Sequence, residues 1–197
     1  EICACLVGSE MCIRDSYNFV TRVQSGPIGR PMRLGKDEVA VCEGIHALND
    51  DIAAYCPDAF RLYISARSIV VDNDGREVFK GTWMRLLRRL VRDSNFRGTP
   101  AAATLDMWAN VRRGEKRFIS PFKERANLMF DSSFPCEVSI LKNYAAPLLA
   151  AVPEGAERYA EIRSILPALE RFETIDPALL APESMLREFI GGGVYSY

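Results

Sequence analysis

FRLYISARSIVVDNDGREVFKGTWMRLLRRLVRDSNFRG, at residues 60–98, changes from a strand pattern to a helix pattern and decides the fold class. Its first part, 60–66, is rich in aromatic and β-branched side chains, which favours a strand. The DNDG at 72–75 is a turn signal. From Gly81 onward the apolar side chains recur on one helix face, at Leu86, Leu87, Leu90 and Val91. We therefore expect a strand, a turn and an amphipathic helix.

The same alternation continues on both sides of this stretch. Short apolar runs predict two further strands: one at 39–42, which would be buried in a parallel sheet, and one at 128–130. Helical periodicity predicts helices over 101–113, 136–152, 157–172 and 183–190. Strands interleaved with helices indicate an α/β fold with a parallel sheet and flanking helices. Three strands are few for such a sheet, so we expect its opening strands to be missing from this sequence.

Composition excludes several classes of protein. The 197 residues are 48% hydrophobic and 26% charged, which is globular, and no apolar run approaches the roughly 20 residues of a membrane helix. The 25 basic and 26 acidic residues give a net charge of -1, so a globally basic nucleic-acid binder is not expected. Six scattered cysteines are typical of free thiols in a reducing compartment, and we expect a cytoplasmic protein.

Residues 1–16 differ from the rest of the chain. EICACLVGSEMCIRDS has no strand or helix period, and its part 6–16 resembles the translation of a sequencing adapter. We expect 1–16 to be non-native and 17–197 to be the C-terminal part of one domain.

A group of arginines carries the strongest functional signal. Four of them, Arg85, Arg88, Arg89 and Arg92, follow at helical spacing, and Arg97 comes just after the predicted helix. A solvated charged face is the ordinary interpretation, but here nearly all charges have one sign. Four arginines so close repel one another unless an anion joins them, and arginine binds phosphate through two hydrogen bonds. The spacing therefore favours a polyanion site.

Other candidate residues give weaker signals. Glu43 follows the apolar run 39–42, where a carboxylate could hold Mg²⁺ or a substrate hydroxyl, or could lie near a helix dipole. His46, the single histidine, suits a structural role because no serine or cysteine nucleophile motif accompanies it. Tyr17 and Phe19 could stack on a base or pack in a core. No G-x-x-x-x-G-K-[ST] phosphate loop is present in the sequence.

Seven segments in the same order resemble the uridine kinase and phosphoribulokinase family of P-loop kinases, most of all the bacterial uridine kinase-like nucleoside kinases. The segments are YNF (17–19), VAVCEGIHALND (39–50), LYISA (62–66), RLLRRLVRDSNFRG (85–98), W-x-x-V-x-x-GE (108–115), PFKERANLMFDSS (121–133) and SMLREFIGG (184–192). The resemblance covers essentially all of 17–197. It implies a P-loop NTPase-type parallel sheet whose first strand and helix, which carry the phosphate loop and a catalytic aspartate, are missing here.

The resemblance also implies roles for single residues. Glu43 matches the glutamate that helps to hold Mg²⁺. Arg89 and Arg92 match catalytic lid arginines, and the other lid arginines that clamp ATP phosphates are Arg85, Arg88 and Arg97, in a lid over 81–100. The nucleoside would bind at Tyr17, Phe19 and Arg22. Such enzymes use ATP and Mg²⁺ to phosphorylate the 5′-hydroxyl of a nucleoside such as uridine or cytidine.

The sequence departs from the family at a few positions. Trp83 stands where members usually have aspartate, Asn18 where they often have aspartate, and Arg22 and Thr99 where uridine–cytidine kinases have histidine and arginine. These departures weaken the preference for uridine.

Two alternatives stay open. One is a sugar-phosphate kinase, whose substrate could be held by Arg22, Arg30 and Arg33. The other is a non-enzymatic surface for RNA or polyphosphate. For the leading interpretation the partners are a nucleoside and ATP, without a membrane or nucleic acid, and with a homo-oligomer left open. We expect the chain as given to be inactive and prone to aggregation.

Overall fold

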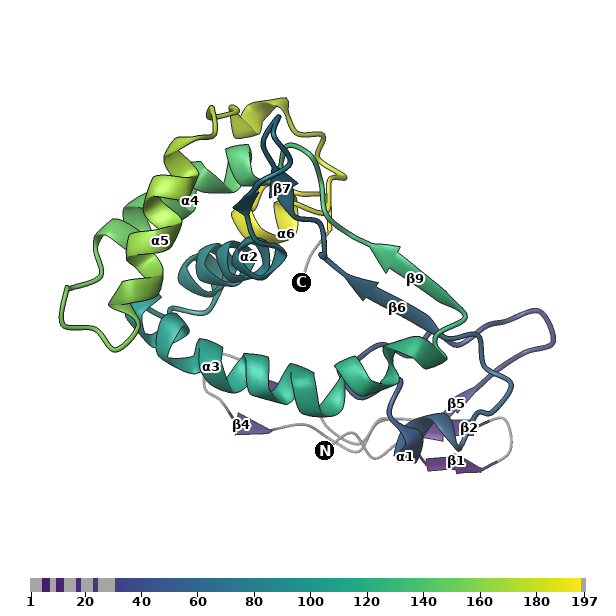
Figure 1. Ribbon diagram of the computed structural model, residues 1–197. Helices are drawn as coiled ribbons and strands as arrows, with labels where there is room; N and C mark the ends of the chain where they lie inside the picture. Colours follow the sequence, from purple (N-terminus) through teal and green to yellow (C-terminus); the bar gives the residue numbers. More distant parts are fainter. Residues whose placement is uncertain (1–4, 8–9, 13–16, 19–22, 25–30, 196–197) are drawn as a thin grey trace.

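A computed structural model describes the backbone of residues 5–7, 10–12, 17–18, 23–24 and 31–195, and the side chains of 34–195. Its fold is mixed α/β, with one parallel pair of strands, antiparallel hairpins and a cluster of helices (Figure 1). No helix among the described residues is long and apolar enough to cross a bilayer.

The parallel pair consists of β6 (Leu62–Ser65) and β9 (Leu128–Asp131). Leu62 lies opposite Leu128, and the pairing runs in register to Ser65 and Asp131. This confirms the strands expected at 60–66 and 128–130. The parallel arrangement needs a long crossover, which here contains a hairpin, two long helices and η1 (Ser120–Arg125).

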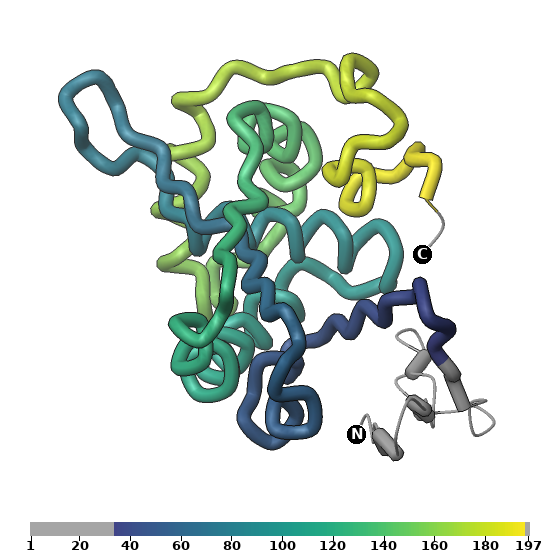
Figure 2. The backbone as a smooth tube through the Cα atoms, turned by 90° about the vertical axis from the view of Figure 1, so that its right-hand side faces the viewer, coloured from purple at the N-terminus to yellow at the C-terminus, as the bar shows by residue number. Residues whose placement is uncertain are grey.

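Between β6 and the first long helix the chain makes a β-hairpin. The sequence predicted the turn of this hairpin but not its two strands. β7 (Val70–Val71) pairs with β8 (Glu77–Phe79), and residues 72–75 form the expected turn. Asp72 accepts hydrogen bonds from the backbone N–H groups of Asp74 and Arg76. Figure 2 shows this turn projecting away from the body of the molecule.

Helix α2 (Gly81–Phe96) lies at the centre of the helical cluster, as expected from its periodicity (Figure 1). It contacts α3 (Ala101–Phe118), α4 (Glu137–Ala150) and α6 (Arg187–Ile190), while α5 (Tyr159–Glu170) packs on α4. The four apolar side chains that predicted its buried face are fully buried in the core: Leu86, Leu87, Leu90 and Val91. Helix α3 runs five residues beyond its expected end at 113, and α6 is shorter than the expected 183–190.

Short elements complete the chain. Helix α1 spans Asp50–Ala53 and η2 spans Pro177–Leu179. Strand β1 (Cys5–Val7) pairs with β2 (Glu10–Cys12), which pairs with β5 (Pro31–Arg33), and β3 (Tyr17–Asn18) pairs with β4 (Val23–Gln24), all antiparallel. We expected no strand in 1–16, so β1 and β2 are a difference from that expectation. The side chains of this segment lie outside the described residues, and its non-native origin stays a prediction.

The strand expected at 39–42 is not formed. These residues are extended or irregular without sheet pairing, and Val39 and Val41 are 85% and 88% exposed. An apolar run becomes a buried strand only where a neighbouring strand completes its hydrogen bonds. No described strand lies beside 39–42, so the parallel sheet is reduced to β6 and β9.

One face of this strand pair is apolar and poorly covered. Side chains alternate along a strand, so residues two apart share a face. The face formed by Leu62, Ile64, Leu128 and Phe130 is 43–54% exposed at each residue. On the opposite face Tyr63 is only 8% exposed, but Met129 beside it on β9 is 43% exposed. We call the first set the apolar strand face.

Candidate anion-binding site

The C-terminal half of α2 holds three arginines around one buried aspartate. Arg89 Nε lies 3.2 Å from Asp93 Oδ2, and Arg92 Nη2 and Arg97 Nη1 each lie 3.2 Å from Asp93 Oδ1. The Asp93 side chain is 2% exposed, whereas each arginine side chain is 24–25% exposed. We call Arg89, Arg92 and Arg97 the arginine cluster.

Helix geometry and the helix end bring these residues together. Arg89 and Asp93 are four residues apart on α2, so their side chains lie one turn apart on the same face. The helix ends at Phe96, and beyond it the N–H groups of Arg97 and Thr99 donate to the Asp93 carbonyl at 3.2 and 3.0 Å. Gly98 adopts φ +58°, a left-handed conformation that favours glycine and turns the chain back. Arg97 is thereby held against Asp93.

The cluster has more positive than negative charge. Arg92 Nη1 has a second carboxylate at 4.0 Å, Glu188 Oε1, but three guanidinium groups still share Asp93. Burial lowers the pKa of Arg97, repulsion from Arg92 and Arg89 lowers it further, and Asp93 opposes this. Although Arg89 Nε is close to Asp93, it is buried without a hydrogen-bond acceptor among the described residues. An oxyanion bound here would relieve the repulsion and accept hydrogen bonds from the partly exposed guanidinium groups.

The two other arginines of the expected lid have partners within the protein. Arg85 pairs with Glu115 of α3. Arg88 forms a bidentate ion pair with Glu137 of α4, with Nη2 2.6 Å from Oε2. Its Nη2 also donates to the Ser132 carbonyl at 2.7 Å. Glu137 is fully buried. These two arginines fasten α2 to its neighbours, so the argument that closely spaced arginines need an external anion does not apply to Arg85 and Arg88.

The structure gives no contact between Glu43 and the arginine cluster, and the expected nucleoside residues fall outside what it describes. Tyr17 belongs to β3, but its side chain, Phe19 and Arg22 lie outside the described residues. Glu43 is exposed and follows the unpaired segment 39–42. Within residues 34–195 no group of three or more His, Cys, Asp or Glu side chains could hold a metal ion. His46 packs edge-on against Phe118, with ring centroids 5.8 Å apart.

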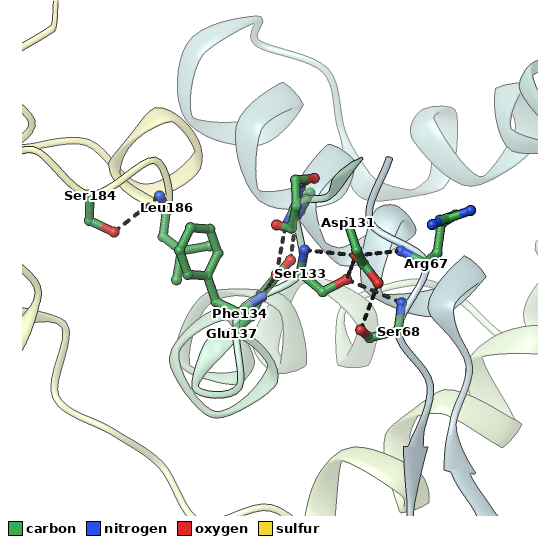
Figure 3. A network of polar contacts seen from close by, with 10 residues as sticks. Arg67, Ser68, Asp131, Ser133, Phe134, Glu137, Ser184 and Leu186 are labelled. Atoms are coloured by element: carbon green, nitrogen blue, oxygen red, sulfur yellow. Dashed lines mark hydrogen bonds and ion pairs between the residues drawn. The ribbon is translucent and has the colours of Figure 1, made fainter. Parts of the chain in front are cut away.

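A second polar network joins the end of β9 to the segment after β6 (Figure 3). Asp131 accepts hydrogen bonds from Arg67 N at 3.1 Å, Ser68 Oγ at 2.9 Å, and Ser133 N and Oγ at 3.0 and 2.7 Å. Burial alone would raise the pKa of Asp131, but the hydrogen bonds from Ser133, Arg67 and Ser68 hold it well below its usual range. All these bonds are internal, which indicates a structural clamp.

Sequence reasoning missed the acids that organise the arginines. Glu115 and Glu137 lie 30 and 49 residues from their partners, and no pattern links residues at such separations. Asp93 could have been found, because it stands four residues after Arg89 and four before Arg97 in one helix pattern.

Comparison with protein-family models, with curated proteins and with solved structures found no match to this chain. The function is therefore argued from the arginine cluster itself.

Proposed function

We propose that the arginine cluster binds the phosphates of a nucleotide, and that the protein is a uridine kinase-like, ATP-dependent phosphotransferase of the cytoplasm. Its acceptor would be the 5′-hydroxyl of a nucleoside such as uridine or cytidine. The observation that carries the proposal is the sharing of one buried carboxylate by three partly exposed guanidinium groups. The order of the seven sequence segments supports the nucleotide as the anion.

The chemistry of the cluster fits phosphate. Guanidinium groups match phosphate oxygens with paired hydrogen bonds, and a polyphosphate carries enough negative charge to balance the cluster. Arg89 contacts Oδ2 of Asp93 and Arg97 contacts Oδ1, so the two guanidinium groups meet at one carboxylate and could hold one phosphate group together. In a phosphoryl transfer such arginines position the group and neutralise the charge that develops on it.

A magnesium site has less support among the described residues than the phosphate site at the arginine cluster. Glu43 is a single exposed carboxylate outside any described metal-binding group, so it does not form a metal site by itself. We therefore assign no step to a metal ion. ATP supplies the transferred phosphoryl group when it is bound, and the arginine cluster holds and orients its phosphates.

Calorimetric titration of the chain with ATP and with adenosine tests the proposal. We expect ATP to bind, adenosine to bind at least tenfold more weakly, and Arg92→Gln to weaken ATP binding about tenfold or more, because a hydrogen bond to a charged group contributes about 1.5–3 kcal/mol. The matched control is Arg113→Gln, an exposed arginine of α3, which should bind ATP as the wild type does. Equal ATP affinity of wild type and Arg92→Gln would refute the site.

The competing polyanion surface makes a different prediction. It requires that single-stranded RNA compete with ATP, with an affinity that falls steeply as salt rises. We expect RNA at equal phosphate concentration to displace ATP poorly. Because the 197 residues hold no G-x-x-x-x-G-K-[ST] motif, we also expect this chain to bind ATP without phosphorylating uridine.

A further inference from the structure

Residues 38–41 have the sequence of a strand but no strand beside them. They run without a helix, turn or bend, and no described strand pairs with them. Val39 and Val41 are 85% and 88% exposed, and every residue of 34–46 except Ala40 is exposed. The segment therefore leaves apolar side chains and the backbone groups of 39–41 in solvent, a condition that favours pairing with the edge of another sheet.

Strand β6 offers such an edge. It pairs with β9 on one side, and no described strand pairs with its other side (Figure 1). Two strands alone are marginally stable in water, whereas three strands with an apolar face can be stable. Leu62 and Ile64 of the apolar strand face are 43% and 54% exposed, so this sheet is reachable from solvent. A third strand would complete it.

The two segments match side chain by side chain when they are set parallel. With Val39 opposite Leu62, Val41 falls opposite Ile64, because alternate residues of a strand share a face. Both valines then extend the apolar strand face instead of lying separately in solvent. Apolar pairs across neighbouring strands stabilise a sheet, so this register is favourable.

The same register brings two opposite charges together. Glu38 falls opposite Arg61, the residue before β6. Neither side chain makes an ion pair with a described residue: Glu38 accepts a hydrogen bond from Gly35 N at 2.8 Å, and Arg61 Nη2 donates to the Pro57 carbonyl at 3.3 Å. The corresponding residue on β9 is Asn127, which is uncharged. Charge complementarity therefore selects the edge of β6.

We propose that two copies of this chain form a dimer by exchanging residues 38–41, each copy adding its segment as a third, parallel strand at β6 of the other. Within one chain the two do not meet: His46 packs on Phe118 of α3, and Asp50 pairs with Arg125 of η1, which fastens the residues after the segment to other elements. Two identical contacts close the dimer with two-fold symmetry. The inference does not rest on the proposed function, because none of these residues belongs to the arginine cluster.

Charge reversal tests the exchange by sedimentation equilibrium. Glu38→Arg and Arg61→Glu should each weaken dimerisation about tenfold or more, because each turns two attractive pairs of the dimer into two repulsive ones. An equimolar mixture of the two single variants should regain wild-type dimerisation, since each altered residue then meets an opposite charge on the other chain. Pairing within one chain would not be rescued by mixing.

Glu157→Arg is the matched control: this exposed glutamate precedes α5, and its reversal changes the net charge equally but should leave dimerisation unchanged. Circular dichroism verifies that the variants fold, and Glu38 is exposed, so Glu38→Arg tests the inference even where Arg61→Glu misfolds. Unchanged dimerisation of Glu38→Arg would overturn the inference. So would a mixture of the two folded variants that associates no better than its components, or a wild type that stays monomeric at every soluble concentration. The ATP titration remains a separate test of the proposed function.

Discussion

Asp93 shows how one buried carboxylate can organise a positively charged site. Its side chain is 2% exposed and faces guanidinium groups from its own helix and from the residue that ends the helix. A carboxylate in that position is tolerated because ion pairs compensate its loss of hydration. In return it fixes three long side chains that would otherwise repel one another. The same residue thus links helix stability to the arrangement of the arginines.

Replacing Asp93 with Asn should destabilise the fold. The neutral amide keeps the volume but leaves three guanidinium groups facing one another, and losing the charged partner of a buried network costs about 1–3 kcal/mol. Urea unfolding monitored by circular dichroism measures the change. Asp106→Asn, an exposed aspartate of α3, is the matched control and should stay within about 0.5 kcal/mol of wild type. Equal stability of the two variants would mean that Asp93 does not organise the cluster.

The clamp at Asp131 predicts a dependence of stability on pH. The folded pKa of Asp131 lies below that of the unfolded chain, so its contribution is fully present above the ordinary aspartate pKa of about 4 and is lost as the pH falls through the lower folded value. The difference in unfolding free energy between wild type and Asp131→Asn should therefore be largest at pH 6–7 and shrink below about pH 4. The measurement is urea unfolding at several pH values. A difference that grows on acidification would contradict the clamp.

Gly81, the first residue of α2, is required by a close approach of the backbone. A Cβ added there would lie 3.0 Å from the carbonyl oxygens of Arg67 and Ser68. Gly81→Ala should lower the unfolding free energy by about 1–3 kcal/mol, because neighbouring backbone cannot yield easily. Gly114→Ala is the control: nothing lies within 4 Å of its added Cβ, and alanine in the middle of α3 should raise stability by about 0.5–1 kcal/mol. Thermal unfolding of both variants measures whether stability falls in Gly81→Ala and rises in Gly114→Ala. Unchanged stability of Gly81→Ala would show that the backbone at Arg67 and Ser68 can move away from the added Cβ.

Among the elements, helices were easier to predict than strands. Helix α2 follows from its own apolar period, and its buried face matches that period residue by residue. A strand depends on a partner that lies elsewhere in the sequence. For this reason 60–66 and 128–130, which pair with each other, were predicted correctly, whereas the equally apolar 39–42 stays unpaired. The hairpin strands β7 and β8 are two and three residues long, too short to give a pattern.

The candidate site was also predictable only in part: the sequence indicates where the arginines lie but not which acids pair with them. The positions of Arg89 and Arg92 follow from helical spacing, and Arg97 was expected just past the end of the helix. Which arginines are already neutralised depends on acids of α3 and α4, and those contacts arise only when the helices pack.

The apolar strand face predicts self-association. Ile64 and Phe130 lie opposite each other in the register of β6 and β9, and they are 54% and 51% exposed. Exposed apolar faces on unpaired strands favour aggregation. Ile64→Lys should raise the concentration at which the chain stays monomeric in sedimentation velocity experiments. The control is Arg113→Lys on α3, which keeps the charge and should leave self-association unchanged. Unaltered association of Ile64→Lys would assign it to another surface.

At the scale of the whole molecule, charge is balanced in sum but not in space. The sequence has a net charge of -1, yet three guanidinium groups gather around one carboxylate at the arginine cluster. The cluster lies near the C-terminal end of α2. A local concentration of cations in a chain that is nearly neutral overall attracts small anions to that place.

The most direct test of the central claim is a nitrogen-15 NMR spectrum of the arginine Nε–H groups during addition of ATP. We predict that the signals of Arg89, Arg92 and Arg97 shift on addition of ATP and do not shift with adenosine at equal concentration. Those of Arg85 and Arg88 should stay in place, because Glu115 and Glu137 already hold them. If the cluster signals do not move, or if all five arginines shift alike, the assignment of a phosphate site to the arginine cluster is wrong.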